Sequence, residues 1–144
     1  MTRSPSPSAA PLSKADYELL AEIRYVLRRF GAFSEEAARG AALTPHHHQA
    51  LLAIKGYPGK ESLTVGELAE RLGVRHHSVV GLIDRLASRG LVRRCTGIED
   101  RRQVRIELTP KAEALLRELS LAHRDELKRL APLLGPLLEQ LQSA

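Results

Sequence analysis

The stretch Leu63–Leu108 constrains the fold of this chain more than any other part of it. It opens with Thr64 and Glu67, which have the spacing of a capping box, where each side chain bonds the backbone N–H of the other residue at a helix start. Two sets of apolar residues then recur at helical spacing, and each precedes a glycine that suits a helix C-terminus. They are Leu68, Ala69 and Leu72 before Gly73, and Val79, Ile83 and Leu86 before Gly90. The pattern predicts two short helices joined by a tight turn.

Two β-like runs follow these helices, Leu91–Cys95 and Gln103–Leu108. They flank a polar and charged segment, Thr96–Arg102, and so predict a two-stranded hairpin with a charged tip. A helix-turn-helix followed by a basic hairpin suits DNA recognition, because the second helix fits the major groove and the hairpin reaches a neighbouring groove.

The positive charge of the chain is concentrated in the same stretch. The whole chain carries a net charge of +5. Between Arg71 and Arg105 there are nine arginines and three carboxylates, a net charge of +6, so the rest of the chain carries −1. All of these cations are arginines, which favours contacts with phosphates and base edges. An arginine-rich face that is merely solvated is the alternative.

The rest of the chain is predicted to be helical, apart from a disordered tail over residues 1–12, where serine and proline alternate. The sequence has two Phe, three Tyr and no Trp, which favours an aliphatic core between packed helices. Apolar spacing and N-caps predict four further helices: Ser13 to Gly31, Ser34 to about Ala42, one that opens at Thr44-Pro45, and a long one that opens at Thr109-Pro110. Pro132 and the pair Gly135-Pro136 predict a kink or a break in the last helix.

The C-terminal segment carries a broad face of leucines: Leu133, Leu134, Leu137, Leu138 and Leu141. The first helix is too small to cover this face as well as its own apolar stripe, so the two ends of the chain predict a homodimer interface. The expected fold class is mainly α with a small β-hairpin wing. It comprises a winged helix-turn-helix domain with N- and C-terminal dimerisation helices.

The order of these elements resembles the MarR family of bacterial transcription regulators. Three motifs carry the resemblance: LxxRGLVRR from Leu86 to Arg94, Asp100-Arg101-Arg102 at the wing tip, and IELTP from Ile106 to Pro110. The resemblance implies one domain over residues 13–144, with residues 43–109 as the DNA-binding part and residues 13–42 and 110–144 as the dimerisation part. It also implies a homodimer that binds double-stranded DNA at a pseudo-palindromic operator, most often as a repressor. Release by a small aromatic or phenolic ligand is a further expectation.

The resemblance assigns DNA contacts to two groups of residues. The first, at the start of the recognition helix, comprises Arg75, His76, His77, Ser78, Gly81 and Arg85. The second, at the wing tip, comprises Asp100, Arg101 and Arg102, where Arg102 would enter the minor groove and Asp100 would orient its guanidinium. An Asp–Arg pair that only shapes the turn, and an ion pair of Arg85 with a carboxylate, are the alternatives. Arg75 and Gly81 depart from the family pattern, which often has Ser and a long polar side chain there.

The run His46–His48 leaves a metal-responsive regulator open. Consecutive helical residues point in different directions, so only His48 is expected to share an inward face with Leu51 and Leu52. A metal site would therefore need His123 or a partner subunit, and no metal or other cofactor is predicted.

Cys95 leaves a redox-responsive regulator of the same fold open. It is the only cysteine, which excludes an internal disulfide and agrees with a reducing compartment. Its neighbours Arg93 and Arg94 are expected to lower the pKa of its thiol. The alternative is a small apolar filler in the first wing strand.

Other function classes lack support in the sequence. There is no run of about 18 apolar residues and no N-terminal signal core, so a cytoplasmic protein without a membrane partner is expected. There is no G-x-S-x-G, glycine-rich phosphate loop or H-E-x-x-H motif, so an enzyme is not expected. An effector-free architectural protein or an RNA-binding protein is the alternative from another class.

Overall fold

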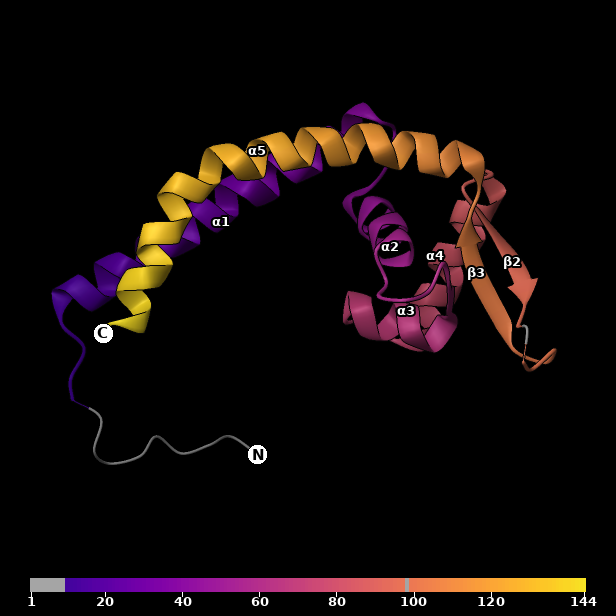
Figure 1. The fold of residues 1–144 in the computed structure, drawn as a ribbon, viewed down its shortest axis with the longest axis horizontal. Helices are drawn as coiled ribbons and strands as arrows, with labels where there is room; N and C mark the ends of the chain where they lie inside the picture. The colour runs from indigo at the N-terminus through magenta and orange to yellow at the C-terminus, as the bar shows by residue number, and fades with distance from the viewer. Residues whose placement is uncertain (1–9, 98) are drawn as a thin grey trace. The chain divides into compact units, whose positions relative to one another are not determined.

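A computed structural model describes residues 10–97 and 99–144, which divide into two compact units (Figure 1). One unit is Phe33–Asp125; the other combines the described residues up to Ala32 with Glu126–Ala144. The elements in chain order are α1 (Lys14–Gly40), α2 (Pro45–Lys55), β1 (Ser62–Thr64), α3 (Val65–Leu72), α4 (His76–Ser88), β2 (Val92–Thr96), β3 (Val104–Leu108) and α5 (Pro110–Gln142). The predicted mainly helical winged helix-turn-helix fold is confirmed. Residues 1–9 of the predicted tail lie outside the described residues.

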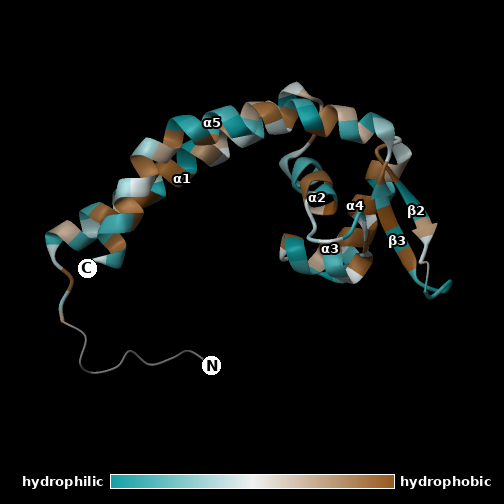
Figure 2. Cartoon of the chain, viewed as in Figure 1, coloured by the Kyte–Doolittle hydropathy of each residue, from teal (hydrophilic) through white to brown (hydrophobic). Residues whose placement is uncertain are grey.

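The core of the unit Phe33–Asp125 joins the helix-turn-helix to the wing. Figure 2 shows hydrophobic residues (brown) along α4 and β3, the two elements that flank this core. Fully buried side chains come from α2, β1, α3, α4 and β3, and include Leu51, Ile54, Leu63, Leu68, Ile83, Leu86 and Ile106. Each such side chain stabilises the fold by about 1.5–3 kcal/mol relative to an exposed position. No helix in the described part of the chain is long and apolar enough to cross a bilayer.

The sheet has three strands, whereas the sequence predicted two. β3 lies between β1 and β2, and both pairings are antiparallel. The added strand β1 places Leu63 opposite Ile106, and both side chains are fully buried. A strand of three residues is too short to show apolar alternation, so only its pairing with β3 reveals it.

The helix ends of the helix-turn-helix follow the local prediction. Glu67 donates its backbone N–H to Thr64 Oγ1 at 3.1 Å, and Thr64 donates its own N–H to Glu67 Oε1 at 3.1 Å, which completes the capping box. Gly73 and Gly90 adopt φ of +66° and +70°, the left-handed conformation that favours glycine after a helix. Local spacing was therefore sufficient to set the limits of α3 and α4.

Threonine caps also start α2 and α5 where the sequence predicted them. Thr44 Oγ1 accepts the backbone N–H of His47 at 3.1 Å, with Pro45 as the first helical residue. Thr109 Oγ1 accepts the backbone N–H of Ala112 at 3.2 Å. A proline loses nothing at this position, because the N–H that it lacks has no partner within the helix.

The predicted break after Gly31 is wrong, since α1 runs without interruption to Gly40. A glycine inside a helix costs only about 1 kcal/mol relative to alanine, which packing can offset. Ser34, predicted as the cap of a separate helix, instead places its Oγ 2.9 Å from His123 Nε2 of α5. Phe33 meets the same histidine ring edge-on, with 5.3 Å between ring centroids. These contacts hold the second half of α1 in helical form.

α5 also continues where a break was one of the two predicted outcomes. Pro132 and Pro136 both lie inside it, and the helix extends to Gln142. A proline in a helix interior costs about 3 kcal/mol, so other contacts must stabilise this segment. Val26 of α1 and Leu130 of α5 are buried in the unit that contains both chain ends. Packing between the two helices supplies the compensation.

Candidate nucleic-acid interface

The start of α4 presents the first group of predicted DNA-binding residues. Arg75 is the N-cap, with extended backbone, and its side chain makes no capping hydrogen bond, as its departure from the family pattern predicted. His76, His77 and Ser78 follow, and all three are exposed. The unsatisfied N–H groups of a helix start attract phosphate. This end of α4 therefore offers exposed polar side chains and free backbone donors together.

Gly81 and Arg85 lie one helical turn apart on α4. A Cβ at Gly81 would lie 3.6 Å from Arg85 Nη1, an ordinary contact distance, so packing does not demand a glycine here. Within the described residues Arg85 forms no ion pair, because Asp84, the adjacent carboxylate, pairs with Arg94. The predicted ion-pair alternative for Arg85 is wrong, and its guanidinium lies near the backbone of Gly81.

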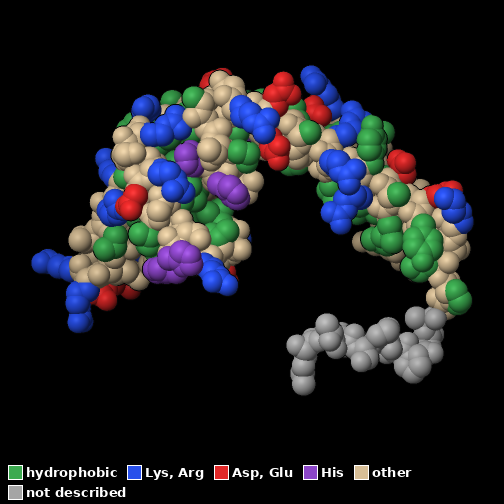
Figure 3. All heavy atoms as spheres, turned by 180° about the vertical axis from the view of Figure 1, so that it is seen from behind, with side chains coloured by type: hydrophobic (Ala, Val, Ile, Leu, Met, Phe, Trp, Pro, Cys, Tyr) green, Lys and Arg blue, Asp and Glu red, His purple; other side chains and the backbone are tan. Residues whose placement is uncertain are grey.

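The wing tip holds the second group. Asp100 Oδ1 accepts the backbone N–H of Arg102 at 3.0 Å and lies 3.7 Å from its guanidinium Nε. The Arg102 side chain is 95% exposed, and Arg101 is exposed beside it. Figure 3 shows Lys and Arg side chains (blue) projecting from the end of the wing. Asp100 thus does two things at once: it shapes the turn and faces the guanidinium of Arg102.

Gly97 lets the wing tip close. A Cβ at this position would lie 2.7 Å from the backbone oxygen of Asp100, a distance that real contacts do not reach. The backbone N–H of Gly97 donates to the carbonyl of Gln103 at 2.9 Å. A glycine here is required by close approach of the backbone, and the short turn it permits brings Asp100 and Arg102 together.

Five of the nine arginines in this stretch are engaged within the protein. They are Arg71 over the Tyr57 ring at 4.8 Å, Arg89 donating to the Ala42 carbonyl at 2.7 Å, Arg93 paired with Glu107 at 2.6 Å, Arg94 paired with Asp84, and Arg105 bonded to Ser62. Arg75, Arg85 and Arg101 make no side-chain hydrogen bond or ion pair with the described residues. Arg102 has only its 3.7 Å contact with Asp100. The four arginines without a close internal partner in the described part of the chain are the four to which the sequence prediction assigned DNA contacts.

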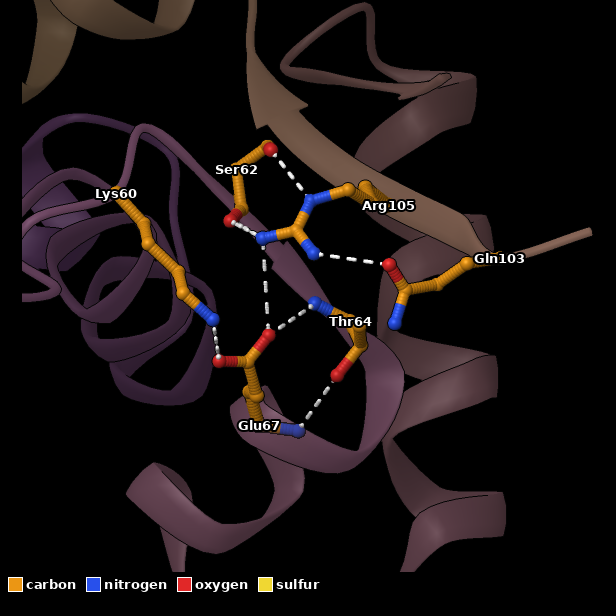
Figure 4. A network of polar contacts seen from close by, with 6 residues as sticks. All are labelled: Lys60, Ser62, Thr64, Glu67, Gln103 and Arg105. Atoms are coloured by element: carbon orange, nitrogen blue, oxygen red, sulfur yellow. Dashed lines mark hydrogen bonds and ion pairs between the residues drawn. The ribbon is translucent and has the colours of Figure 1, made fainter. Parts of the chain in front are cut away.

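Arg105 anchors the base of the wing to the segment before α3 (Figure 4). Its Nε donates to Ser62 Oγ at 2.8 Å, and its Nη2 donates to the Ser62 carbonyl at 2.5 Å. Nη1 donates to Gln103 Oε1 at 3.2 Å, and Nη2 lies 3.7 Å from Glu67 Oε1. Because Arg105 and Ser62 are 43 residues apart, no local sequence signal identifies this network.

Glu67 is the centre of the same network. Lys60 Nζ donates to its Oε2 at 2.8 Å, while Oε1 accepts the Thr64 N–H of the capping box. The hydrogen bond from Lys60, then that from Thr64, lowers the pKa of Glu67 to about 2. The carboxylate therefore stays charged through the physiological range and links α3 to the strand that carries the wing.

The histidine run is buried more deeply than predicted. His47 and His48 are both buried, at 8% and 3% exposure, whereas Leu52 is 48% exposed. The predicted inward face of His48 with Leu51 and Leu52 is thus wrong for Leu52 and omits His47. The helix α2 is oriented so that residues 47, 48, 51 and 54 lie on the face that packs against the core.

His48 contacts His123, with 4.6 Å between ring centroids. His123 Nδ1 lies 2.6 Å from the Leu119 carbonyl, but neither ring nitrogen of His48 has a hydrogen-bond partner among the described residues. Burial first, and then the neighbouring His123, lowers the pKa of His48. The described residues contain no group of three or more His, Cys, Asp or Glu side chains placed to hold a metal ion.

Cys95 lies on β2, opposite Arg105, and is partly buried. Burial and the Glu107 carboxylate raise the pKa of its thiol, and outweigh Arg105 and Arg93, which act in the opposite direction. The predicted lowering of this pKa by the flanking arginines is therefore wrong. In a paired strand, the pKa of the thiol depends more on burial and on Glu107 of the neighbouring strand than on the residues adjacent in sequence.

In this chain a helix-turn-helix is followed by a β-wing, and both carry arginines without a close partner in the described residues. This arrangement is typical of the winged-helix class of transcription regulators. A family model described as the MarR family matches residues 43–103. The repressor NicR of Pseudomonas putida is 30% identical over 121 residues, which cover 81% of this chain and 74% of NicR. The regulator YfiV of Bacillus subtilis is 39% identical over 75 residues, which cover 52% of this chain and 47% of YfiV. The chain belongs to the MarR family of transcriptional regulators.

Solved structures share the fold at lower identity. A MarR family protein from Bacillus stearothermophilus superposes with a TM-score of 0.75 at 23% identity, over 93% of this chain and 97% of that one. A mutant MarR from E. coli, solved with operator DNA, gives a TM-score of 0.67 at 24% identity, over 93% of this chain and 97% of that one. The winged-helix architecture is therefore common to all three chains.

Proposed function

We propose that this protein is a transcriptional repressor that binds a pseudo-palindromic operator as a homodimer and releases it when a small aromatic ligand binds. One observation carries the DNA-binding part of the proposal. Arg75, Arg85 and Arg101 are exposed and make no side-chain hydrogen bond or ion pair with the described residues, and Arg102 has only its 3.7 Å contact with Asp100. The other five arginines of the stretch have partners within the protein. Such a regulator acts on DNA in the cytoplasm.

In this proposal the start of α4 enters the major groove and the wing tip reaches the adjacent minor groove. His76, His77 and Ser78 face base edges and phosphates, and the N-terminal amides of α4 favour phosphate. The narrow minor groove concentrates negative potential, which attracts the Arg102 guanidinium. Asp100 restricts that side chain in advance, so less conformational entropy is lost on binding.

Two similar proteins support repression and DNA binding. NicR of P. putida is named as a transcriptional repressor. A mutant MepR from Staphylococcus aureus was solved bound to an oligodeoxyribonucleotide, and it shares this fold with a TM-score of 0.67. Residues 43–109 would form the DNA-binding part of the chain, and residues 13–42 and 110–144 the dimerisation part.

The chain ends support the homodimer. Their compact unit has a groove of about 260 Å³ lined by Val26, Leu27, Phe30, Leu127, Leu130, Ala131 and Leu134. Large apolar side chains of the same unit are about half exposed: Tyr17, Leu20, Tyr25, Leu27, Leu127, Leu133, Leu138 and Leu141. Apolar surface of this extent favours a second copy of the chain. In such a homodimer we expect the two α4 helices to lie about one helical turn of DNA apart, roughly 34 Å, so that they enter successive major grooves.

A pocket between the start of α2 and α4 supports the ligand part of the proposal. It has a volume of about 400 Å³ and is lined by Thr44, His46, His47, Leu72, Val74, Ser78, Leu82 and Arg85. The apolar side chains of Leu72, Val74 and Leu82, with polar groups and the Arg85 cation opposite an acid group, suit a small aromatic acid. Because Ser78 and Arg85 would also meet DNA, an occupied pocket would withdraw them from the operator.

The wing assignment is tested by replacing Arg102. Binding-site selection first identifies the operator, and fluorescence anisotropy then measures its affinity over a range of salt concentrations. Arg102→Ala should weaken binding by about 1–3 kcal/mol and lower the salt slope by about 1 for each phosphate contact that is lost. Lys128→Ala, which removes an exposed cation from α5, is the control and should leave operator affinity unchanged.

Two results would contradict the proposal. Equal affinities of the Arg102→Ala variant and the unmodified protein would show that the wing does not contact the operator. Selection that returns no inverted repeat would favour the architectural alternative.

A further inference from the structure

The outward face of α4 carries one large apolar side chain among polar ones. Val79, Leu82, Ile83 and Leu86 are buried and hold the helix against the core. Val80 points away from them and is 39% exposed. Of the large hydrophobic side chains exposed in the described part of the chain, it is the one that α4 contributes. Under the proposed function this isopropyl group stands at the surface that enters the major groove.

The composition of this face limits how it can read bases. From His76 to Asp84 the helix contains no Lys, Arg, Asn or Gln, the side chains that make paired hydrogen bonds to guanine or adenine edges. Asp84, which could accept from cytosine, is paired with Arg94. His76, His77 and Ser78 can each make single hydrogen bonds. Apolar contact is therefore the most discriminating base contact available to the middle of this helix.

The neighbouring glycine lets a short side chain reach the bases. Gly81 follows Val80 and has no side chain to hold the helix away from the groove floor. Arg85 Nη1 lies 3.6 Å from the position of a Cβ at Gly81, on the flank of the helix. The net charge of +6 between Arg71 and Arg105 favours a polyanion as the partner of this surface over an apolar protein.

We propose that Val80 recognises the C5 methyl group of a thymine in each half-site of the operator. Thymine is the base that presents a methyl group in the major groove, beside its O4 acceptor. The inference rests on the proposed function and adds a specificity determinant to it. Burial of one methyl group between Val80 and the base predicts a preference of about fourfold for each half-site.

Deoxyuridine tests the proposal because it lacks only this methyl group. Each thymine of the selected operator is replaced in turn, symmetrically in both half-sites, and the affinity is measured. At one symmetric pair of positions the replacement should weaken binding about 15-fold. Synthetic operator contains no 5-methylcytosine, so the loss identifies thymine as the source of the methyl group.

Val80→Ala supplies the matching protein variant. It should bind the thymine operator as weakly as the unmodified protein binds the deoxyuridine operator, and it should not distinguish the two. Alanine favours the helix and the site is exposed, so folding is retained. Val104→Ala, at a valine of β3 that is 49% exposed, is the control and should keep the full discrimination.

Operator binding and thymine recognition by Val80 can fail separately. If no deoxyuridine replacement weakens binding of the unmodified protein more than that of Val80→Ala, the Val80 inference is overturned while operator binding stands. If selection yields no preferred sequence, the proposed function fails and the Val80 inference fails with it.

Discussion

His48 brings a titratable ring into the core, where neither nitrogen has a hydrogen-bond partner in the part of the chain that the structure describes. Its pKa is lowered from the ordinary value of 6.5 because burial and His123 disfavour the cation. The unfolded chain therefore binds a proton more readily than the folded protein does. The contribution of neutral His48 to the free energy of unfolding is fully present above pH 6.5 and is lost as the pH falls below that value.

His48→Leu should remove part of this pH dependence. The free energy of unfolding, measured by urea denaturation between pH 5 and 8, should fall less steeply below pH 6.5 than in the unmodified protein. At pH 8 the variant should be as stable or up to about 2 kcal/mol more stable, because two unsatisfied nitrogens are removed. His46→Leu, at an exposed position of α2, is the control and should keep the original profile. Identical profiles for His48→Leu and the unmodified protein would refute the argument.

The same residue shows where local sequence reasoning reaches its limit. Three consecutive histidines are conspicuous in the sequence, but only the apolar residues near them indicate which of the three faces the core. Leu52 proved exposed and His47 proved buried. A short helix between two packed elements can turn one way or the other, and its neighbours decide which.

The wing is held to the helix-turn-helix by polar contacts between α3, β1 and β3. Glu67 joins Lys60, Thr64 and Arg105 in one network (Figure 4). Its pKa of about 2, against an ordinary value of 4.5, means that its ionised form stabilises the fold. That contribution is present above pH 4.5 and is lost as the pH falls toward 2.

Glu67→Gln should weaken this connection without removing the cap. The amide oxygen can still accept the Thr64 N–H, but the charged contacts with Lys60 and Arg105 are lost. The variant should be less stable at pH 7 by about 1 kcal/mol and should lose less stability between pH 4.5 and 2, as followed by denaturation monitored by circular dichroism. Glu70→Gln, at an exposed position of the same helix, should behave like the unmodified protein. An unchanged acid profile for Glu67→Gln would rule out the network as a source of stability.

The two long helices show how packing overrides local breakers. Gly31 does not end α1, and Pro132 and Pro136 do not end α5. A glycine or proline inside a helix destabilises that helix by about 1–3 kcal/mol relative to alanine. Contacts of α1 with α5, such as that between Ser34 and His123, are of similar size and decide the outcome.

The assembly proposed for the whole molecule depends on the exposed apolar side chains of the chain ends. Leu133→Asp combined with Leu138→Asp places two charges among them, at positions that are 48% and 44% exposed. Sedimentation at micromolar concentration should show a monomer, and operator affinity should fall sharply because each monomer reaches one half-site. Leu52→Asp, at a leucine that is 48% exposed on α2, should remain dimeric.

Circular dichroism separates dissociation from unfolding in this experiment. Helical content close to that of the unmodified protein, together with the mass of a monomer, supports the interface. A double variant that remains a dimer would place the interface elsewhere.

Most of the winged helix could be predicted from the sequence because its signals are local. These signals are the capping box, the threonine–proline helix starts and the glycines that follow helices. Each involves residues within about one helical turn, so their spacing alone predicts α3, α4 and the starts of α2 and α5. The wing-tip pair Asp100 and Arg102 is equally local, and the structure brings the two together as expected. Their role in DNA binding stays a prediction.

Tertiary structure decided what depends on residues far apart in the chain. It paired β1 with β3, kept α1 intact and raised the pKa of Cys95 through burial and Glu107. Above all, it divided nine arginines that look alike in the sequence into five that contact other parts of the protein and four that make at most one weak contact with the described residues. The composition gives the number of charged side chains. Whether each arginine is available to bind DNA depends on partners that only the folded chain brings within bonding distance.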